Sequence, residues 1–254
     1  MRRLPNISLT DKEVLTLVTN HKLNHGGEAI ICKPTPTRLF KIFSDTSDQT
    51  KPTITTMSEN KERKVIELFN LQPEYSTLPL STLSLNGELI GYEVTYDPQD
   101  KDVFPFILPP KKQIEFLEET KRILEYYKSI GITYGDVNFR NILENKKTGK
   151  LKFCDMDNIQ ISDYPIDLYD CDLRDYIEKR GQVDVYTDAY MHSIMTLHLL
   201  DLDLYGCGEE YFKFFFTKKG QELIAALQDK TTYDGEYLVK HIRKKFRRWK
   251  EYLI

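Results

Sequence analysis

Two polar motifs follow each other in the second half of the sequence, each next to a short apolar segment. Residues 134–143 read YGDVNFRNIL, which places Asp136 five residues before Asn141. In the following FCDMDN, Asp155 comes directly after the strand-like LKFC. Carboxylate and amide side chains weaken strands, so strand propensity does not explain them. Their oxygens suit a hard cation such as Mg²⁺, which commonly joins protein carboxylates to substrate phosphates. The motifs therefore predict a site for metal-bound phosphates.

The carboxylate of Asp136 also suits a role in catalysis. An aspartate beside metal-bound phosphates can orient the hydroxyl group that attacks them. Taken alone, Asp136 and Asn141 are equally compatible with a turn, because both residue types favour turns. Asp157 competes with Asp155 as the metal ligand, and otherwise it serves as a second carboxylate near the metal or as a turn cap. The strand-like segment before Asp155 favours Asp155.

These two motifs resemble the protein kinase-like superfamily. YGDVNFRN resembles its catalytic loop, written H-[RG]-D-x-x-x-x-N, and FCDMDN resembles its metal-binding D-F-G segment. The resemblance implies two cofactors, ATP and Mg²⁺. It assigns Asp136 to the substrate hydroxyl, and Asn141 and Asp155 to the Mg²⁺ that binds between the phosphates.

A lysine in the first half of the chain extends the resemblance. RLFKIF resembles the third strand of the family, which implies that Lys41 contacts the ATP phosphates. Flanked by Phe40 and Ile42 on a strand, Lys41 points away from both, as a lysine facing a cleft does and as a solvent-facing lysine also does. NKERKVIEL resembles helix C, with Glu62 as the first candidate for the partner of Lys41 and Glu67 as the second.

Two further segments resemble the part of the family that surrounds the nucleotide. LNHGGEAIICKP resembles the glycine-containing nucleotide loop, which places Gly26 and Gly27 beside the phosphates. A Gly pair is more often a plain hairpin turn, and the full G-x-G-x-x-G is absent. GYEVTYD resembles the hinge, with Thr95, Tyr96 and Asp97 beside adenine.

Hydrophobic periodicity predicts the elements that position these residues. Strands are predicted at 28–33, 38–43, 142–144 and 151–154 and on both sides of the Asn-Gly turn in 83–96, and helices at 60–71, 109–131, 187–202 and from about 208. Together they predict an α+β fold, which the resemblance specifies as a two-lobed protein kinase-like fold. Residues 1–96 would form a small β-rich N-lobe, and residues 97–254 a larger, mostly helical C-lobe. Asp188 would support the catalytic loop from below.

Composition sets limits on location and partners. The formal net charge is −3, so charge alone requires neither a nucleic acid nor a membrane as partner. The four cysteines form no C-x-x-C pair, which argues against a zinc site and for a reducing compartment. The N-terminus does not resemble a secretory signal, and no apolar run is long enough to span a membrane. We therefore expect a cytoplasmic protein.

The last 16 residues, 239–254, carry seven Lys or Arg and one Glu. Such a basic segment can contact nucleic acid or an anionic surface. Its apolar residues also recur at helical spacing, which favours a terminal helix packed on the rest of the protein with a solvated basic face. We prefer the second interpretation, and nucleic acid stays open as a partner.

The activity that the resemblance implies is phosphate transfer from ATP to a hydroxyl. The predicted strands and hinge favour a serine/threonine protein kinase-like enzyme. Asn138, where protein kinases of this type have a lysine, admits a small-molecule kinase instead. Met156-Asp157 replaces Phe-Gly, and no A-P-E signature follows. A nucleotide-binding pseudokinase that acts through a partner is the third alternative, because the glycine loop is altered.

Gly135 stands where many regulated protein kinases carry an arginine that binds an activating phosphate. We therefore predict that activity does not depend on phosphorylation of the chain. The test compares phosphotransfer by phosphatase-treated and mock-treated protein. Equal rates are expected, and a several-fold loss after dephosphorylation would contradict the prediction.

Overall fold

The computed structural model describes residues 3–25, 28–45, 53–166, 174, 177, 181–184 and 186–199. The chain divides into two compact units. The first comprises Met1–Asp102 and Ile142–Asp167, and the second comprises Val103–Asn141 and Leu168–Ile254. The lobe boundary expected after residue 96 stays a prediction.

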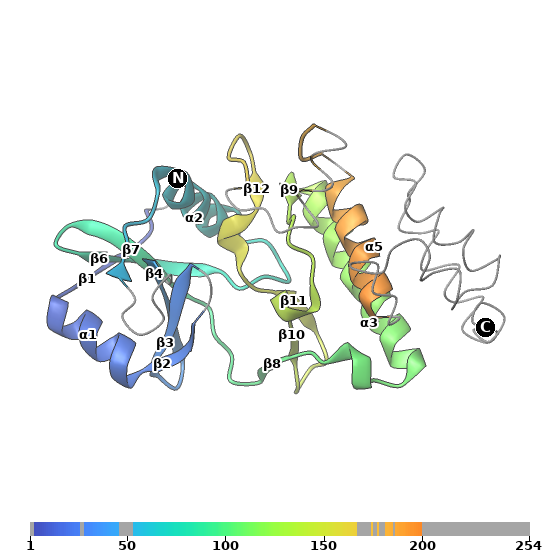
Figure 1. The fold of residues 1–254 in the computed structure, drawn as a ribbon, viewed down its shortest axis with the longest axis horizontal. Helices are drawn as coiled ribbons and strands as arrows, with labels where there is room; N and C mark the ends of the chain where they lie inside the picture. The colour runs from blue at the N-terminus through green and yellow to red at the C-terminus, as the bar shows by residue number, and fades with distance from the viewer. Residues whose placement is uncertain are drawn as a thin grey trace, which may run out of the picture. The chain divides into compact units, whose positions relative to one another are not determined.

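A seven-stranded mixed sheet dominates the first unit (Figure 1). Its order is β1 (Asn6–Leu9), β6 (Pro79–Leu85), β7 (Glu88–Val94), β4 (Arg38–Asp45), β3 (Ala29–Thr35) and β2 (Lys22–His25), with β5 (Thr53–Ile54) beside β4. β1 runs parallel to β6, and the other pairs are antiparallel. Asn86 and Gly87 join β6 to β7 with φ of 52° and 87°, as a two-residue hairpin turn requires. The predicted Asn-Gly turn is confirmed.

Two helices belong to this unit, α1 (Asp11–Asn20) and α2 (Glu59–Leu71). α1 begins with a capping box, in which Thr10 and Glu13 satisfy each other's backbone N–H groups. The side chain of Ser58 caps the first turn of α2. The helix that the sequence predicted ahead of the hairpin is confirmed by α2.

The two helices contribute to separate hydrophobic clusters that share strand β4. Ile42 packs in one cluster with Val14 of α1, and Phe43 packs in the other with Val65 of α2. Side chains alternate between the two faces of a strand, so Lys41 lies on the same face as Phe43. The prediction that Lys41 points away from its neighbours in the strand is confirmed.

A smaller antiparallel sheet carries the second polar motif. It comprises β8 (Asp100–Asp102), β10 (Ile142–Asn145) and β11 (Leu151–Phe153), and the 3₁₀ turn η3 (Met156–Asn158) and strand β12 (Gln160–Ile161) follow. Backbone hydrogen bonds of 2.7 and 2.9 Å tie Phe153 to Tyr75 and Thr77. They fix the end of β11 within the first unit, and the strands predicted from both apolar segments are confirmed.

The second unit contains the first polar motif between two helices. Its described elements are η1 (Pro105–Ile107), α3 (Pro110–Ser129), β9 (Ile132–Thr133), η2 (Phe139–Asn141) and α5 (Thr187–Leu199). α3 and α5 pack against each other (Figure 1), and the buried His192 ring lies 3.0 Å from the carbonyl oxygen of Leu117. Both helices agree with the sequence prediction over their described lengths.

The structure is α+β, as expected, but the predicted two-lobed protein kinase-like fold is wrong. A small β-rich lobe with a larger helical lobe was expected, but the largest described element is the seven-stranded sheet. The described residues contain four α-helices, of which only α3 and α5 belong to the second unit. The sheet is larger than expected because strands β1, β2 and β5, which no sequence pattern had indicated, add to it. The tail helices predicted from residue 208, including the basic segment, lie outside the described residues.

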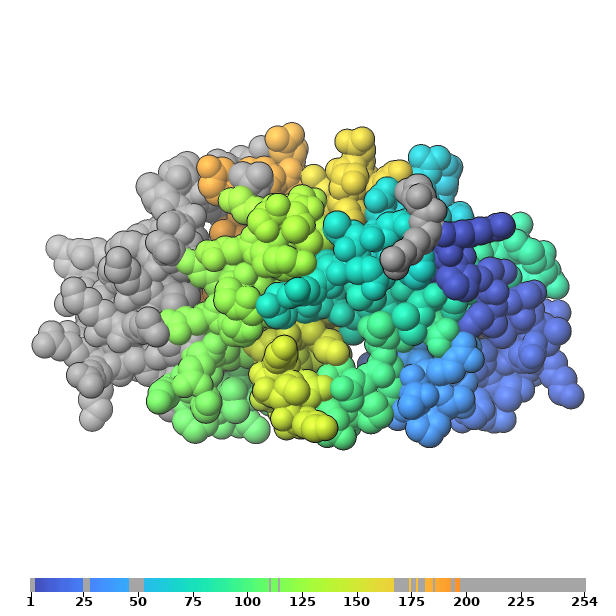
Figure 2. All heavy atoms as spheres, turned by 180° about the vertical axis from the view of Figure 1, so that it is seen from behind, coloured from blue at the N-terminus to red at the C-terminus, as the bar shows by residue number. Residues whose placement is uncertain are grey.

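Within the described ranges, no helix has the length and apolar character that a bilayer crossing requires. The N-terminal segment, blue in Figure 2, forms part of the surface of the first unit. Leu15 and Leu23 of this segment are 62% and 59% exposed. Single exposed apolar side chains of this kind are ordinary and need no partner.

Gly91 in β7 is required by the close approach of the backbone that carries Lys41. A Cβ atom at this position would lie 2.0 Å from the carbonyl oxygen of Lys41. We predict that Gly91→Ala lowers the free energy of unfolding by about 1–3 kcal/mol, because β4 and β7 must separate. Glu88→Ala, at an exposed position of the same strand, should change it by less than about 0.5 kcal/mol. Urea unfolding measures both, and equal effects would contradict the prediction.

Candidate functional site

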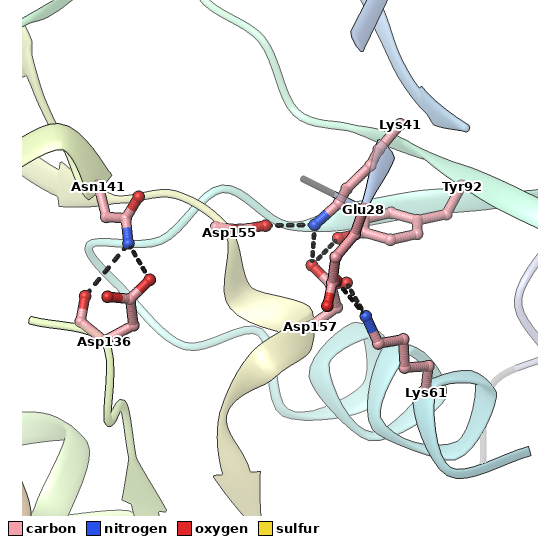
Figure 3. A network of polar contacts seen from close by, with 8 residues as sticks. All are labelled: Glu28, Lys41, Lys61, Tyr92, Asp136, Asn141, Asp155 and Asp157. Atoms are coloured by element: carbon pink, nitrogen blue, oxygen red, sulfur yellow. Dashed lines mark hydrogen bonds and ion pairs between the residues drawn. The ribbon is translucent and has the colours of Figure 1, made fainter. Parts of the chain in front are cut away.

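Lys41 is the centre of a buried ionic network in the first unit (Figure 3). Its ammonium group donates to Asp155 and, at 2.6 Å, to Oδ1 of Asp157, and the residue is only 7% exposed. Burial would lower the pKa of Lys41, but the charges of Asp157 and Asp155 outweigh it and raise the pKa well above its ordinary value. Lys41 therefore carries a positive charge inside the protein.

Asp157 is the most enclosed member of the network. It is fully buried, and Oδ1 also accepts a hydrogen bond of 2.6 Å from the Tyr92 hydroxyl. Lys61 of α2 lies 3.6 Å from Oδ2. Burial would raise the pKa of Asp157, but the two ammonium groups outweigh it and hold the pKa well below its usual range. This carboxylate is thus ionised and fixed on several sides.

Asp155 differs from Asp157 in exposure and in backbone geometry. Its side chain is 44% exposed. Its φ of 60° and ψ of 45° are left-handed, an uncommon conformation for a residue other than glycine. Lys41 would lower the pKa of Asp155, but partial burial and the neighbouring charge of Asp157 outweigh it and raise the pKa. The η3 turn and the residue before it thus present two carboxylates in different environments to one lysine.

Lys61, not Glu62, is the residue of α2 that faces this network. Its ammonium group lies 2.5 Å from Oε2 of Glu28 and 4.7 Å from the ring centre of Phe43. Glu62 is half-buried in the first turn of α2, and no contact of the described residues joins it to Lys41. The structure therefore brings Lys41 and Asp155 together, as expected from the sequence, but leaves Glu62 apart from them.

The first two hinge candidates take part in contacts with neighbouring segments. The backbone N–H of Thr95 donates to the carbonyl oxygen of Leu78 at 2.8 Å, and its hydroxyl accepts from the N–H of Leu78 at 2.8 Å. The hydroxyl of Tyr96 lies 3.0 Å from the ammonium group of Lys33. The N–H of Thr95 is therefore engaged within the sheet, and its contact with a nucleotide stays a prediction.

The remaining nucleotide candidates are Asp97, Gly26 and Gly27. Asp97 accepts hydrogen bonds of 2.9 Å from the N–H of Gln99 and 2.8 Å from the amide of Asn145. The bond from Gln99 is the main reason that the pKa of Asp97 is lowered. These contacts give Asp97 a role in the turn after β7. Gly26 and Gly27 lie outside the described residues.

In the second unit, two amide groups hold the carboxylate of Asp136 (Figure 3 shows that of Asn141). The Asn138 side chain donates to Oδ1 at 2.6 Å, and the Asn141 side chain donates to Oδ2 at 2.7 Å. Asn138 in turn accepts from the N–H of Arg140 at 2.9 Å. Both carboxylate oxygens are therefore oriented by the loop itself, which is more than a simple turn requires.

Asp188 of α5 fixes the start of this loop. Its two oxygens accept from the backbone N–H groups of Tyr134 at 2.9 Å and Gly135 at 2.7 Å. Gly135 has a φ of 80°, which a glycine adopts without strain. Burial raises the pKa of Asp188 to about 6 although both N–H groups oppose the shift. The support of the loop by Asp188 is confirmed.

The donor atoms suit the expected metal, although only in part. The described chain has no group of three His, Cys, Asp or Glu side chains that would hold an ion by themselves. The amide nitrogen of Asn141 is the atom that donates to Asp136, so its oxygen is the atom left for a cation. The half-exposed carboxylate of Asp155 is likewise accessible. Each unit thus offers one oxygen donor, which suits Mg²⁺ only where phosphate and water supply most of its ligands.

Comparison with known proteins gives no match, either to a family model or to a curated protein. The assignment of the site therefore depends on its residues alone.

Sequence reasoning missed three members of the network, Lys61, Tyr92 and Glu28. Lys61 is one residue before the expected Glu62. One residue turns an α-helix by about 100°, so the two side chains lie on different faces of α2. Asp157 was recognised only as an alternative to Asp155. The available signal was the spacing D-x-D after a buried strand, because two carboxylates so close together need cations nearby.

His192 gives the second unit a defined dependence on pH. Burial lowers the pKa of the His192 ring to about 4, although its contact with the Leu117 carbonyl oxygen opposes the shift. The unfolded chain therefore binds a proton near pH 6.5 that the folded protein binds only near pH 4. We predict that acidification from pH 7 to pH 4 destabilises the wild type by about 3 kcal/mol relative to His192→Gln.

Unfolding in urea at several pH values measures this difference. The other titrating groups, Asp188 included, are common to both proteins and cancel in the comparison. A difference in unfolding free energy that is constant from pH 7 to pH 4 would show that His192 is not held in its neutral form.

Proposed function

We propose that this protein is an ATP- and Mg²⁺-dependent phosphotransferase that transfers the γ-phosphate to a hydroxyl group. The observation that carries the proposal is the ion pair between Lys41 and Asp155. Lys41 is a charged lysine on a strand, and its ammonium group can bind the phosphates of a nucleotide. Asp155 is a partly exposed carboxylate after a second short strand, and it can bind the metal of the same nucleotide. The comparisons neither help nor oppose this proposal.

The residues of the first unit would bind the nucleotide. Lys41 offers a fixed positive charge for the α- and β-phosphates. Asp155, whose side chain is 44% exposed, offers its carboxylate to Mg²⁺. MgATP, when bound, supplies the phosphoryl group and the neutralising charge for its transfer. The contribution of the protein is positioning and electrostatic stabilisation.

The residues of the second unit would act on the acceptor. Asp136 is held by two amide groups, so its carboxylate can accept a hydrogen bond from a substrate hydroxyl in a fixed direction. The oxygen of Asn141 is the metal ligand that this unit offers. Asp188 keeps the loop in place from behind, through backbone contacts alone.

A serine or threonine hydroxyl of a protein is the leading acceptor, and a small-molecule hydroxyl is the alternative. The contacts of Asn138 favour the alternative. Its amide group is engaged with Asp136 and Arg140, so no side chain at this position extends to the transferred phosphate as the lysine of serine/threonine protein kinases does. A phosphate acceptor screen with both classes of hydroxyl separates the two.

We place the protein in the cytoplasm, where MgATP is supplied and thiols stay reduced. Neither Cys32 nor Cys154 forms a disulfide within the described part of the chain, and burial raises the pKa of each thiol, to about 11 and about 12. Thiols of this kind are inert toward oxidation, which suits a structural role.

The central test is transfer of labelled phosphate from ATP to the chain itself or to a generic protein. We predict that Asp136→Asn lowers the rate about 10²–10⁴-fold, because the amide cannot accept the proton of the attacking hydroxyl. Asp163→Asn, at an exposed turn of the first unit, is the matched control and should keep the wild-type rate. Equal transfer by Asp136→Asn and the control would remove the support for an enzyme and favour the pseudokinase.

Binding of the metal is tested separately by thermal unfolding. Wild-type protein should gain stability from ATP only when Mg²⁺ is present, by about 2.7 kcal/mol at a ligand concentration of 100 Kd. Asp155→Ala should lose this magnesium-dependent gain, whereas Asp163→Ala should keep it. A full magnesium-dependent gain in Asp155→Ala would exclude Asp155 as a metal ligand.

A further inference from the structure

The ionic network contains more carboxylates than ammonium groups. Asp155, Asp157 and Glu28 face two lysines, Lys41 and Lys61. One carboxylate is therefore available to another cation without leaving either lysine unpaired. The question is which of the two carboxylates on Lys41 can leave it.

Exposure distinguishes the two carboxylates. The side chain of Asp155 is 44% exposed, and among the described residues its ionic partner is Lys41. The side chain of Asp157 is 0% exposed and contacts Lys41, Tyr92 and Lys61. Moving Asp157 away from Lys41 would leave buried charges unpaired, which costs several kcal/mol. When Asp155 moves toward another cation, Lys41 stays paired with Asp157.

We infer that Asp157 is the positioning residue that permanently holds Lys41, and that Asp155 is the exchangeable partner that turns to the metal. This inference rests on the proposed function for its consequence in catalysis. Asp157 takes the place that the resemblance gave to a carboxylate of α2, namely Glu62.

Lys61 connects helix α2 to this anchor. It contacts Oδ2 of Asp157 and also Glu28, the residue directly before β3. The ring of Phe43 lies under the Lys61 ammonium group, and its centre is 6.2 Å from that of the Tyr92 ring. The expected link was a carboxylate of α2, Glu62, on Lys41. Instead, α2 contributes the ammonium group of Lys61, which contacts Asp157 of η3, and Asp157 holds Lys41.

The first experiment measures steady-state phosphotransfer by the full chain at varied MgATP. Asp157→Asn should raise the KM for MgATP about tenfold or more, because Lys41 loses its fixed position, and the effect on KM should exceed that on kcat. Glu62→Gln should have the smaller effect of the two. Asp163→Asn controls for the loss of a negative charge. A larger effect of Glu62→Gln than of Asp157→Asn on KM would overturn the inference.

The second experiment uses no nucleotide and so does not depend on the proposed function. Thermal midpoints are measured for Lys41→Met, Asp157→Asn, Glu62→Gln and the two double variants that contain Lys41→Met. The shift of Lys41→Met with Asp157→Asn should be clearly smaller than the sum of the single shifts, because the residues share one interaction. The shift of Lys41→Met with Glu62→Gln should be additive. The reverse pattern would overturn the inference.

Tyr92→Phe keeps the test decisive if Asp157→Asn does not fold. It removes only the hydroxyl that donates to Asp157 and keeps the ring and every charge. KM for MgATP should rise several-fold with little change in kcat, and an unchanged KM would overturn the inference. Absence of phosphotransfer in the wild type would reject the proposed function, and the thermal midpoints would then decide the role of Asp157 alone.

Discussion

The burial of one lysine ammonium group sets the main constraint on the first unit. Lys41 lies inside the protein, where an unpaired charge is far too costly, so two carboxylates must reach it. Asp155 directly precedes η3 and Asp157 lies within it, so this turn has to be held against β4. The anchoring of β11 on the segment before β6 and the contact of Lys61 with Asp157 accomplish this. A strand, a short turn and a helix are thus joined by charge as well as by apolar packing.

The loop of the second unit obeys a different constraint, the satisfaction of its own polar groups. Asp188 receives two backbone N–H groups, and Asp136 receives two side-chain amides. Neither carboxylate needs a cation to hold it in place. The two units thus hold their carboxylates in different ways, the first with ammonium groups and the second with amide and backbone N–H donors.

Local patterns in the sequence predicted most of the described elements, but not the fold. The strand pattern of residues 38–43 predicted β4 and the orientation of Lys41, and helical periodicity predicted α2 and α3. Residues 6–25 carry no strong pattern, and their addition to the sheet depends on pairing with strands distant in sequence. The contact of Lys41 with Asp155 was anticipated only through the resemblance, since 114 residues separate them. The choice of Asp157 and Lys61 as partners depends on which face of η3 and α2 turns inward, which only the tertiary structure specifies.

The central claim of the proposed function is that Lys41 binds the phosphates and Asp155 binds the metal of one nucleotide. Titration calorimetry of ATP against wild-type and Lys41→Met protein, with Mg²⁺ and with a chelator, tests this claim most directly. The account predicts saturable binding by the wild type that needs Mg²⁺, and its loss in Lys41→Met. Equal binding by both proteins, or binding that ignores Mg²⁺, would contradict it.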